Sequence, residues 1–195
     1  MNNSNGSRSH INKTCLLLLL LLFGLIGTAY STVPARAADR EYTIKAIFLY
    51  NFFNYITWPT DSMQQDQSAT TLCIYGEDPF GEALSYVEKK SRPQRALHIK
   101  RLGNKALNKD TPCHILFVSQ SESDHLTKLN GEINRPGMLT VSDIQGFADS
   151  KGIIEFTKDH DRIKLTINAT RLQQAGFKAS SQLMKIATII KPEAE

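Results

Sequence analysis

LCIYGEDPFGEALSYVEKK, residues 72–90, is the stretch that decides the fold. Residues 72–75 are apolar, and so short a run is typical of a strand buried inside a parallel sheet. Gly76 to Pro79 predicts a turn, and residues 80–89 predict a helix that Asp78 can cap. A strand, a turn and a helix in this order predict an α/β fold, in which strands alternate with helices.

The same alternation continues toward the C-terminus, and one long helix precedes it. Further strands are expected at residues 97–101, 114–118, 138–141, 152–157 and 162–168. Helices are expected at residues 41–57, near 124–130, between Asn168 and Gly176, and at 180–188. The last two strands lie close together in the sequence and predict a hairpin. We therefore predict a single three-layer α/β domain whose mainly parallel sheet has about five to six strands and a C-terminal antiparallel hairpin extension.

The N-terminus predicts a secretory signal peptide at residues 1–37. Basic residues precede an apolar run at residues 16–26, which is too short to span a bilayer comfortably. Small residues follow and end in Ala35-Arg36-Ala37, the pattern of a cleavage site. An uncleaved membrane anchor is the alternative. We expect cleavage after Ala37 and a mature domain at residues 38–195 that works outside the cytoplasm.

The expected mature domain is nearly neutral. The whole chain has 23 basic and 19 acidic residues, and three of the basic residues lie in the signal segment. The mature domain would thus carry 20 basic and 19 acidic residues, a formal net charge of +1. Nucleic-acid-binding domains are strongly basic, so this composition argues against nucleic acid as a partner. No second long apolar segment follows the first, so we do not expect the mature protein to span a membrane.

Two cysteines remain after cleavage, Cys73 and Cys113. An even pair in an oxidising compartment predicts a disulfide, and two buried free thiols are the alternative. If the strands at 72–75 and 114–118 are parallel neighbours, both cysteines lie near the N-terminal ends of their strands. That arrangement would bring the two side chains within bridging distance.

Residues typical of catalysis or metal binding occur without the surroundings that such chemistry needs. The glycine spacing from Gly76 to Gly81 resembles a phosphate-binding loop, but the Lys-Ser/Thr ending is missing and two acidic residues stand inside it. Ser142-Asp143 follows a strand, yet no G-x-S-x-G turn surrounds the serine. The histidines of the mature domain lack zinc-ligand spacing; they are His98, His114, His125 and His160. We therefore expect no catalytic residue, no metal and no cofactor.

The first helix carries more apolar surface than one core contact requires. Its apolar side chains fan over about 180°, whereas a helix that covers a core on one side needs about 100°. The helix is either deeply buried or in contact with the core on one side and with another subunit on the other. In the second case the partner or dimer interface consists of Phe48, Phe52, Phe53, Tyr55 and Trp58. We expect Phe53 to be an exposed position.

The densest positive charge follows the helix at 80–89. It includes Lys89, Lys90, Arg92 and Arg95. Such a cluster is either an ordinary solvated loop or a docking patch for an acidic protein face or anionic lipid headgroups.

Six segments of the chain, taken in order, resemble the YfiR family. They are YTIKAIFLYNFFNYITWP (42–59), CIYGEDPFG (73–81), CHILFVS (113–119), LTVSDIQGFA (139–148), GIIEF (152–156) and INATRLQQAGFKASSQLMKIA (167–187). They cover nearly the whole expected mature chain, and the ordered set is more specific than any one segment.

The resemblance implies a bacterial periplasmic protein with no catalytic motif. The best-understood proteins of this type inhibit an inner-membrane diguanylate cyclase by binding its periplasmic sensor domain. An outer-membrane lipoprotein can sequester the inhibitor, after which cyclic di-GMP and biofilm formation rise. The resemblance also implies a homodimer and a disulfide between Cys73 and Cys113.

Two other kinds of protein remain open. One is a periplasmic small-molecule binder or an accessory protein for another signalling receptor. A small-molecule binder would use a pocket at the C-terminal ends of the strands, near Gly76, Ser119 and Ser142. A hydrolase would need an activated nucleophile, and nothing in the sequence selects one.

Overall fold

The computed structural model describes residues 35–59, 69–92, 96–105, 107, 111–160 and 162–191. Most of the expected signal peptide, residues 1–34, lies outside the described residues, as does Arg95. The expected cleavage site after Ala37 falls in the first turn of helix α2 (Ala35–Tyr55). Residues 38–195 form a compact unit separate from residues 1–37.

The described residues form a seven-stranded sheet in the order β3-β2-β4-β5-β6-β7-β9. Its strands are β2 (Ala69–Tyr75), β3 (Ala96–Gly103), β4 (Ile115–Val118), β5 (Leu139–Ser142), β6 (Ile154–Asp159), β7 (Arg162–Asn168) and β9 (Ala187–Ile190). The first five strands in this order, β3, β2, β4, β5 and β6, are parallel to one another. Strand β7 is antiparallel to β6, and β9 is parallel to β7. The predicted parallel sheet, its C-terminal hairpin and the pairing of the strands at 72–75 and 114–118 are therefore confirmed.

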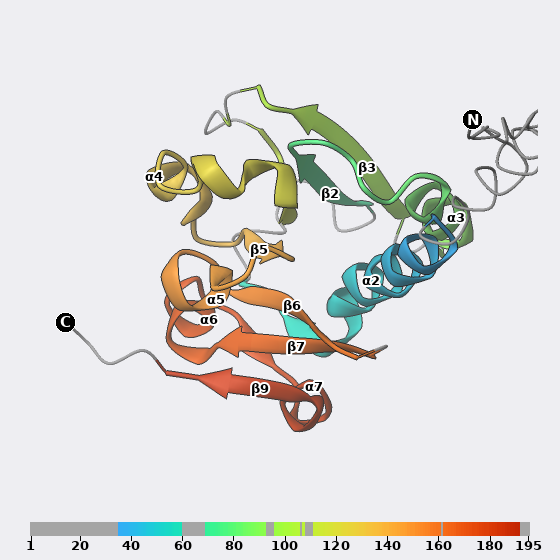
Figure 1. Ribbon diagram of the computed structural model, residues 1–195. Helices are drawn as coiled ribbons and strands as arrows, with labels where there is room; N and C mark the ends of the chain where they lie inside the picture. The colour runs from blue at the N-terminus through green and yellow to red at the C-terminus, as the bar shows by residue number, and fades with distance from the viewer. Residues whose placement is uncertain are drawn as a thin grey trace, which may run out of the picture. The chain divides into compact units, whose positions relative to one another are not determined.

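Helices cover both faces of the sheet (Figure 1), as expected for a three-layer domain. Helix α2, α3 (Glu82–Lys90) and α7 (Ser181–Ile186) pack on one face, and α4 (Asn130–Ile133) and α5 (Phe147–Ser150) pack on the other. Apolar and polar residues do not alternate along central strand β4, because both of its faces are buried. Ile115 and Phe117 belong to one core, and Leu116 and Val118 belong to the other, so every residue of β4 is buried.

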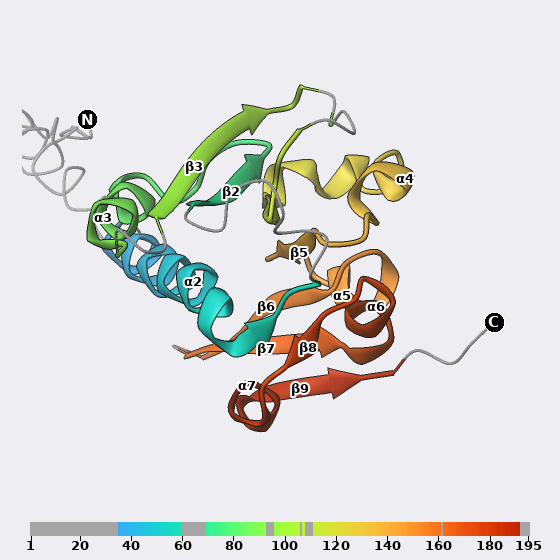
Figure 2. The same ribbon diagram turned by 180° about the vertical axis from the view of Figure 1, so that it is seen from behind.

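Three of the predicted helices differ from the observed elements. The helix expected near 124–130 is replaced by a 3₁₀ helix, η2 (Gln120–His125), followed by the single turn of α4. The helix expected at 180–188 ends at Ile186, and its remainder belongs to β9. The first helix ends at Tyr55, because the next two residues pair as strand β1 (Ile56–Thr57) with β8 (Lys178–Ala179), which Figure 2 labels.

Side-chain caps fix the ends of the C-terminal helices. The Asn168 carboxamide accepts a hydrogen bond from Arg171 N at 2.9 Å and donates one to Ala148 O at 2.8 Å, which ties α6 (Ala169–Gln174) to α5. The Ser180 hydroxyl accepts from Leu183 N at 3.3 Å at the start of α7. Asp78 was expected to cap α3, but it does not. Its carboxylate accepts from Phe80 N at 2.8 Å and so closes the turn before the helix.

Candidate functional site

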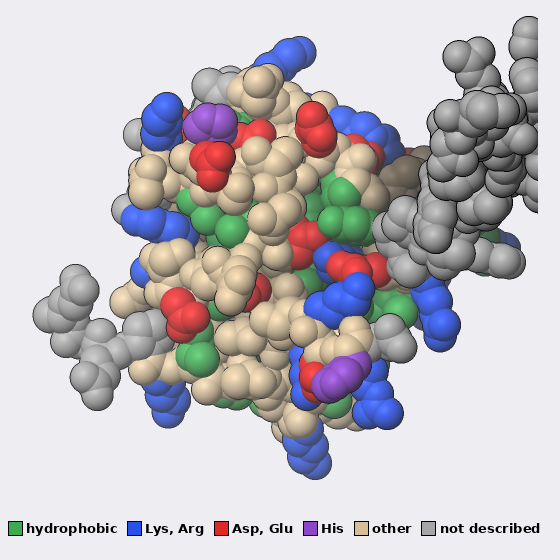
Figure 3. Space-filling model, in the orientation of Figure 1, with side chains coloured by type: hydrophobic (Ala, Val, Ile, Leu, Met, Phe, Trp, Pro, Cys, Tyr) green, Lys and Arg blue, Asp and Glu red, His purple; other side chains and the backbone are tan. Residues whose placement is uncertain are grey.

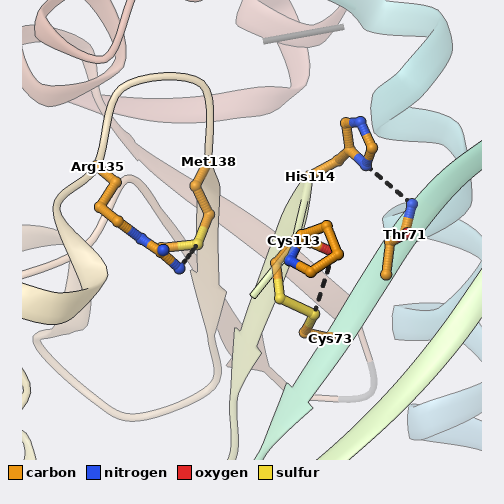
Figure 4. The surroundings of a disulfide bond; sticks show 7 residues. Thr71, Cys73, Cys113, His114, Arg135 and Met138 are labelled. Carbon is orange, nitrogen blue, oxygen red and sulfur yellow. Dashed lines mark hydrogen bonds between the residues drawn. A yellow bond between two sulfur atoms is a disulfide. The ribbon is translucent and has the colours of Figure 1, made fainter. Parts of the chain in front are cut away.

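The structure contains the predicted disulfide between Cys73 of β2 and Cys113, which lies just before β4 (Figure 4). The two Cα atoms are 5.7 Å apart, a normal distance for a bridge. The half-buried imidazole of His114 follows the bridge, and its Nδ1 accepts a hydrogen bond from Thr71 N at 3.0 Å. Burial lowers the pKa of His114 below its ordinary value. The bridge and this hydrogen bond both join β2 to β4.

The aromatic residues of α2 divide between the core and the surface. Phe52 is buried, and Phe53 is only 6% exposed because it stacks on Trp58 at 5.1 Å between ring centroids. Trp58 is half-buried and also meets Phe177 edge-on. The expectation that Phe53 is exposed was therefore wrong, because the chain beyond the helix folds back and covers that side chain. Phe48 and Tyr55 keep exposed surface.

An apolar groove runs between α2 and α7. Its walls include Ile44, Ile47, Phe48 and Tyr55 of α2 and Leu183 and Ile186 of α7, and its volume is about 330 Å³. Ile47 is 48% exposed and Ile186 is 62% exposed, although both are large and apolar. Neither isoleucine was predicted to be at an interface, because neither segment alone reveals that α2 packs beside α7.

A buried ionic cluster holds the N-terminal half of α2 against the end of β5. The Lys45 ammonium group lies 2.7 Å from a carboxylate oxygen of Glu41 and 2.7 Å from Oδ2 of Asp143. The Tyr42 hydroxyl donates to the same Oδ2 at 2.9 Å, and Lys158 of β6 pairs with Glu41 at 3.0 Å. The Lys45 and Asp143 side chains are only 4% and 7% exposed, so the pair is shielded from water.

The pKa values in this cluster follow from burial and from the neighbouring charges. Burial raises the pKa of Tyr42, and the negative charge of Asp143 raises it further, so the hydroxyl stays protonated and donates. For Glu41, burial acts to raise the pKa, but hydrogen bonds from Lys45 and Lys158 outweigh it and hold the pKa below its ordinary value. The cluster lines a cavity of about 260 Å³ that also includes Gln120.

This cavity lies next to the place expected for a small-molecule pocket, but the three residues named for it have structural roles. The Ser142 hydroxyl donates to Val118 O at 2.7 Å and accepts from Ile144 N at 3.0 Å. Ser119 caps η2. Gly76 has a φ of 91° and lies so close to η2 that a Cβ would be 2.5 Å from Ser121 Oγ. Asp143 and Gln120, one residue further along in each case, line the cavity instead.

The turn that resembles a phosphate-binding loop is occupied by its own chain. Gly76 N donates to Gly103 O at 2.7 Å, and Glu77 N donates to Ser121 Oγ at 3.0 Å. These amides are thus directed at protein acceptors. Among the residues that the structure describes, no group of three or more His, Cys, Asp or Glu side chains is arranged to hold a metal ion.

The described residues of the predicted basic patch are exposed, and none of them lines the groove or the cavity described above. Lys89 and Lys90 end α3, Arg92 follows, and all three are exposed. The Lys90 ammonium lies 5.8 Å from the centre of the Tyr86 ring. Figure 3 shows one face of the molecule, on which acidic and basic side chains are interspersed. The patch therefore remains a hypothesis for docking.

The chain matches the model of a known protein family. A protein-family model described as YfiR/HmsC-like matches residues 42–188, which is most of the chain. No curated protein matches it. Within the described residues, no helix has the length and apolar character needed to cross a membrane.

Proposed function

We propose, since this chain belongs to the YfiR/HmsC-like family, that it is a periplasmic regulator that binds and represses an inner-membrane diguanylate cyclase. The family is regulatory rather than catalytic, and it acts in diguanylate cyclase signalling. In this proposal the partner is the periplasmic sensor domain of the cyclase. Repression lowers cyclic di-GMP and with it biofilm formation.

The α2–α7 groove is the observation that supports binding. Exposed apolar side chains grouped around a hollow are typical of protein contact surfaces, whereas single exposed apolar residues are common anywhere. Ile47 and Ile186 stand on opposite walls of the groove and are both largely exposed. We therefore revise the interface from Phe48, Phe52, Phe53, Tyr55 and Trp58 to Ile47, Phe48 and Tyr55 of α2 with Ile186 of α7.

Repression across a membrane requires preferential binding to one state of the cyclase. A regulator with equal affinity for the active and the inactive sensor domain would shift no equilibrium, however tightly it bound. The groove must therefore fit a surface that the sensor domain presents in its inactive state.

The test is Ile47→Glu, expressed in a strain that lacks the native gene. A carboxylate buried in an apolar contact costs several kcal/mol, so affinity for the sensor domain should fall at least about 100-fold. Cyclic di-GMP should rise to the level of the deletion strain. Tyr86→Glu is the matched control, because Tyr86 is an exposed large side chain (63%) on α3, outside the groove. This control should repress like the wild type, and immunoblots should show equal periplasmic amounts of both variants.

Two results would contradict parts of the proposal. Normal repression by Ile47→Glu would remove the groove as the interface. Unchanged cyclic di-GMP in the deletion strain, with the cyclase expressed, would remove the cyclase as the target.

We also propose a homodimer and sequestration by an outer-membrane lipoprotein. Light scattering of the purified wild-type protein and of Ile47→Glu tests the dimer and shows whether the groove forms it. Pull-down with solubilised outer membranes tests the lipoprotein, and absence of a captured lipoprotein would remove that part of the proposal.

A second candidate function is small-molecule binding at the Lys45–Asp143 cluster. Its cavity lies where α/β proteins commonly bind ligands, beyond the C-terminal ends of parallel strands. Thermal unfolding against a library of polar metabolites tests it, because a ligand that binds only the folded state raises the Tm. A shift that Asp143→Asn removes would support this function.

A further inference from the structure

A second polar cavity lies at the opposite end of the sheet from the Lys45–Asp143 cluster. It has a volume of about 220 Å³ and lies between the segment that enters β5 and helix α6. Arg135 lines the cavity from the segment that enters β5, and Arg171 lines it from α6. None of the described residues that line it is acidic.

The Arg171 guanidinium is held by one hydrogen bond and keeps donors to spare. Its Nη2 donates to Ser150 O at 2.9 Å, which fixes the orientation of the planar group. Its Nε is buried and has no hydrogen-bond partner within the described part of the chain. No carboxylate of the described residues lies within ion-pairing distance of this guanidinium group. A buried donor without an acceptor is costly, and an arginine cannot lose its charge to avoid that cost.

Arg135 is also held in place. Its guanidinium folds back over Met138, with Nη2 3.3 Å from Sδ (Figure 4). Met138 and Ile153 are buried and form apolar walls of the cavity. Gln174 lines the cavity from α6 and adds an amide donor.

A cavity that two guanidinium groups line, and that no acidic side chain of the described residues lines, has a positive potential that favours an anion. The guanidinium fork matches the two oxygens of a carboxylate or phosphate better than it matches a spherical ion. The volume is below the roughly 300–1,000 Å³ of sites for drug-sized ligands. The occupant is therefore a small oxyanion or the charged end of a larger molecule.

We propose that the Arg135–Arg171 cavity binds an oxyanion, either a phosphate or a carboxylate group. Arg171 supplies the oriented fork, Arg135 the second positive charge, and Gln174 a neutral donor. The inference concerns the isolated domain and is independent of the proposed partner.

The experiment measures thermal unfolding and calorimetric binding of the purified full domain with inorganic phosphate, acetate or chloride at equal ionic strength. Phosphate or acetate should raise the Tm in a saturable way, and chloride should not. Arg171→Gln should weaken binding about 10- to 100-fold, because one charged donor is lost. Arg162→Gln, which removes an exposed arginine of β7 outside the cavity, should bind like the wild type. If Arg171→Gln does not fold, Arg135→Gln serves in its place.

The pattern of responses decides both the proposal and the source of the anion. Saturable binding of phosphate alone assigns the site to phosphate groups, and binding of acetate alone assigns it to carboxylates. Phosphate also stabilises proteins by exclusion from their surface, and that effect is equal in all variants. An equal response of the wild type and Arg171→Gln, or no response beyond chloride, would overturn the proposal.

Discussion

The imidazole of His114 makes stability depend on pH. Its Nδ1 accepts the Thr71 amide only while that nitrogen carries no proton, and burial lowers its pKa in the folded state. The unfolded chain takes up the proton first, near pH 6.5, so stability is complete above that pH and falls as the pH drops toward the folded pKa. His114→Asn keeps an acceptor but does not titrate. The loss of stability from pH 7.5 to 5.5 should therefore be smaller in this variant, as measured by urea unfolding.

The control for His114 is His98→Asn, because His98 is exposed on β3. It should show the same pH dependence as the wild type. If His114→Asn loses as much stability on acidification as the wild type does, His114 is not the titrating group.

Lys45 and Lys158 belong to the same ionic cluster, but we predict that they contribute very differently to the stability of the fold. Lys45→Met leaves a buried carboxylate without its counter-ion and should lower the free energy of unfolding by about 3–5 kcal/mol. Lys158→Met removes the exposed partner of Glu41 and should cost less than about 1 kcal/mol. Urea unfolding of both variants at pH 7 checks the difference. Equal losses would mean that the buried pair does not hold α2 to β5.

Single residues were predictable where their chemistry is local or where the predicted topology brings them together. The cap by Asn168 depends on a residue three positions away, and the disulfide was predicted from compartment and topology. The pairing of Asp143 with Lys45 was not predicted, because the two residues lie 98 positions apart in the sequence. The exposure of Phe53 was misjudged for a different reason: Trp58, beyond the end of the helix, stacks on Phe53, and Phe177 packs edge-on against Trp58.

At the scale of elements, the disulfide should be a main source of stability. It joins positions 40 residues apart, and closing such a loop contributes on the order of 4 kcal/mol in the chain-entropy treatment. The double variant Cys73→Ala/Cys113→Ala should therefore lower the Tm by roughly 8–16 °C in a domain of this size. Calorimetry of the oxidised wild type, the reduced wild type and the double variant checks it. As a control, reduction should not change the Tm of the double variant. An unchanged Tm on reduction of the wild type would contradict the prediction that the disulfide stabilises the domain.

Elements were predictable where one periodicity runs through the whole segment. Strands β2, β4 and β7 and helix α3 all lie within a few residues of their predicted bounds. The first two residues of strand β9 (Ala187–Ile190) were assigned to a helix, because they continue its apolar pattern and become a strand only by pairing with β7. Strand β1 was assigned to α2 for the corresponding reason, since Ile56 pairs with Ala179. Pairing between distant segments overrides local preference in both cases.

At the scale of the whole molecule, we predict that the exported protein begins at Ala38. The signal pattern covers residues 1–37, and cleavage after Ala37 removes from the described elements only the first three residues of α2. N-terminal sequencing of periplasmic protein should read Ala38-Asp39-Arg40. A membrane-retained product that starts at Met1 would contradict the prediction.

The order of the strands also has a consequence in time. Strand β2 comes first, β3 adds to one side of it, and β4, β5, β6, β7 and β9 then add to the other side in the order in which the chain presents them. No strand of this sheet has to insert between two strands that already pair, so each new strand can add to an edge of the sheet. Contacts between successive strands keep the closing loops short, which favours fast assembly. For the same reason, shortening the chain from its C-terminus removes strands from the rim one at a time and leaves the earlier pairs joined.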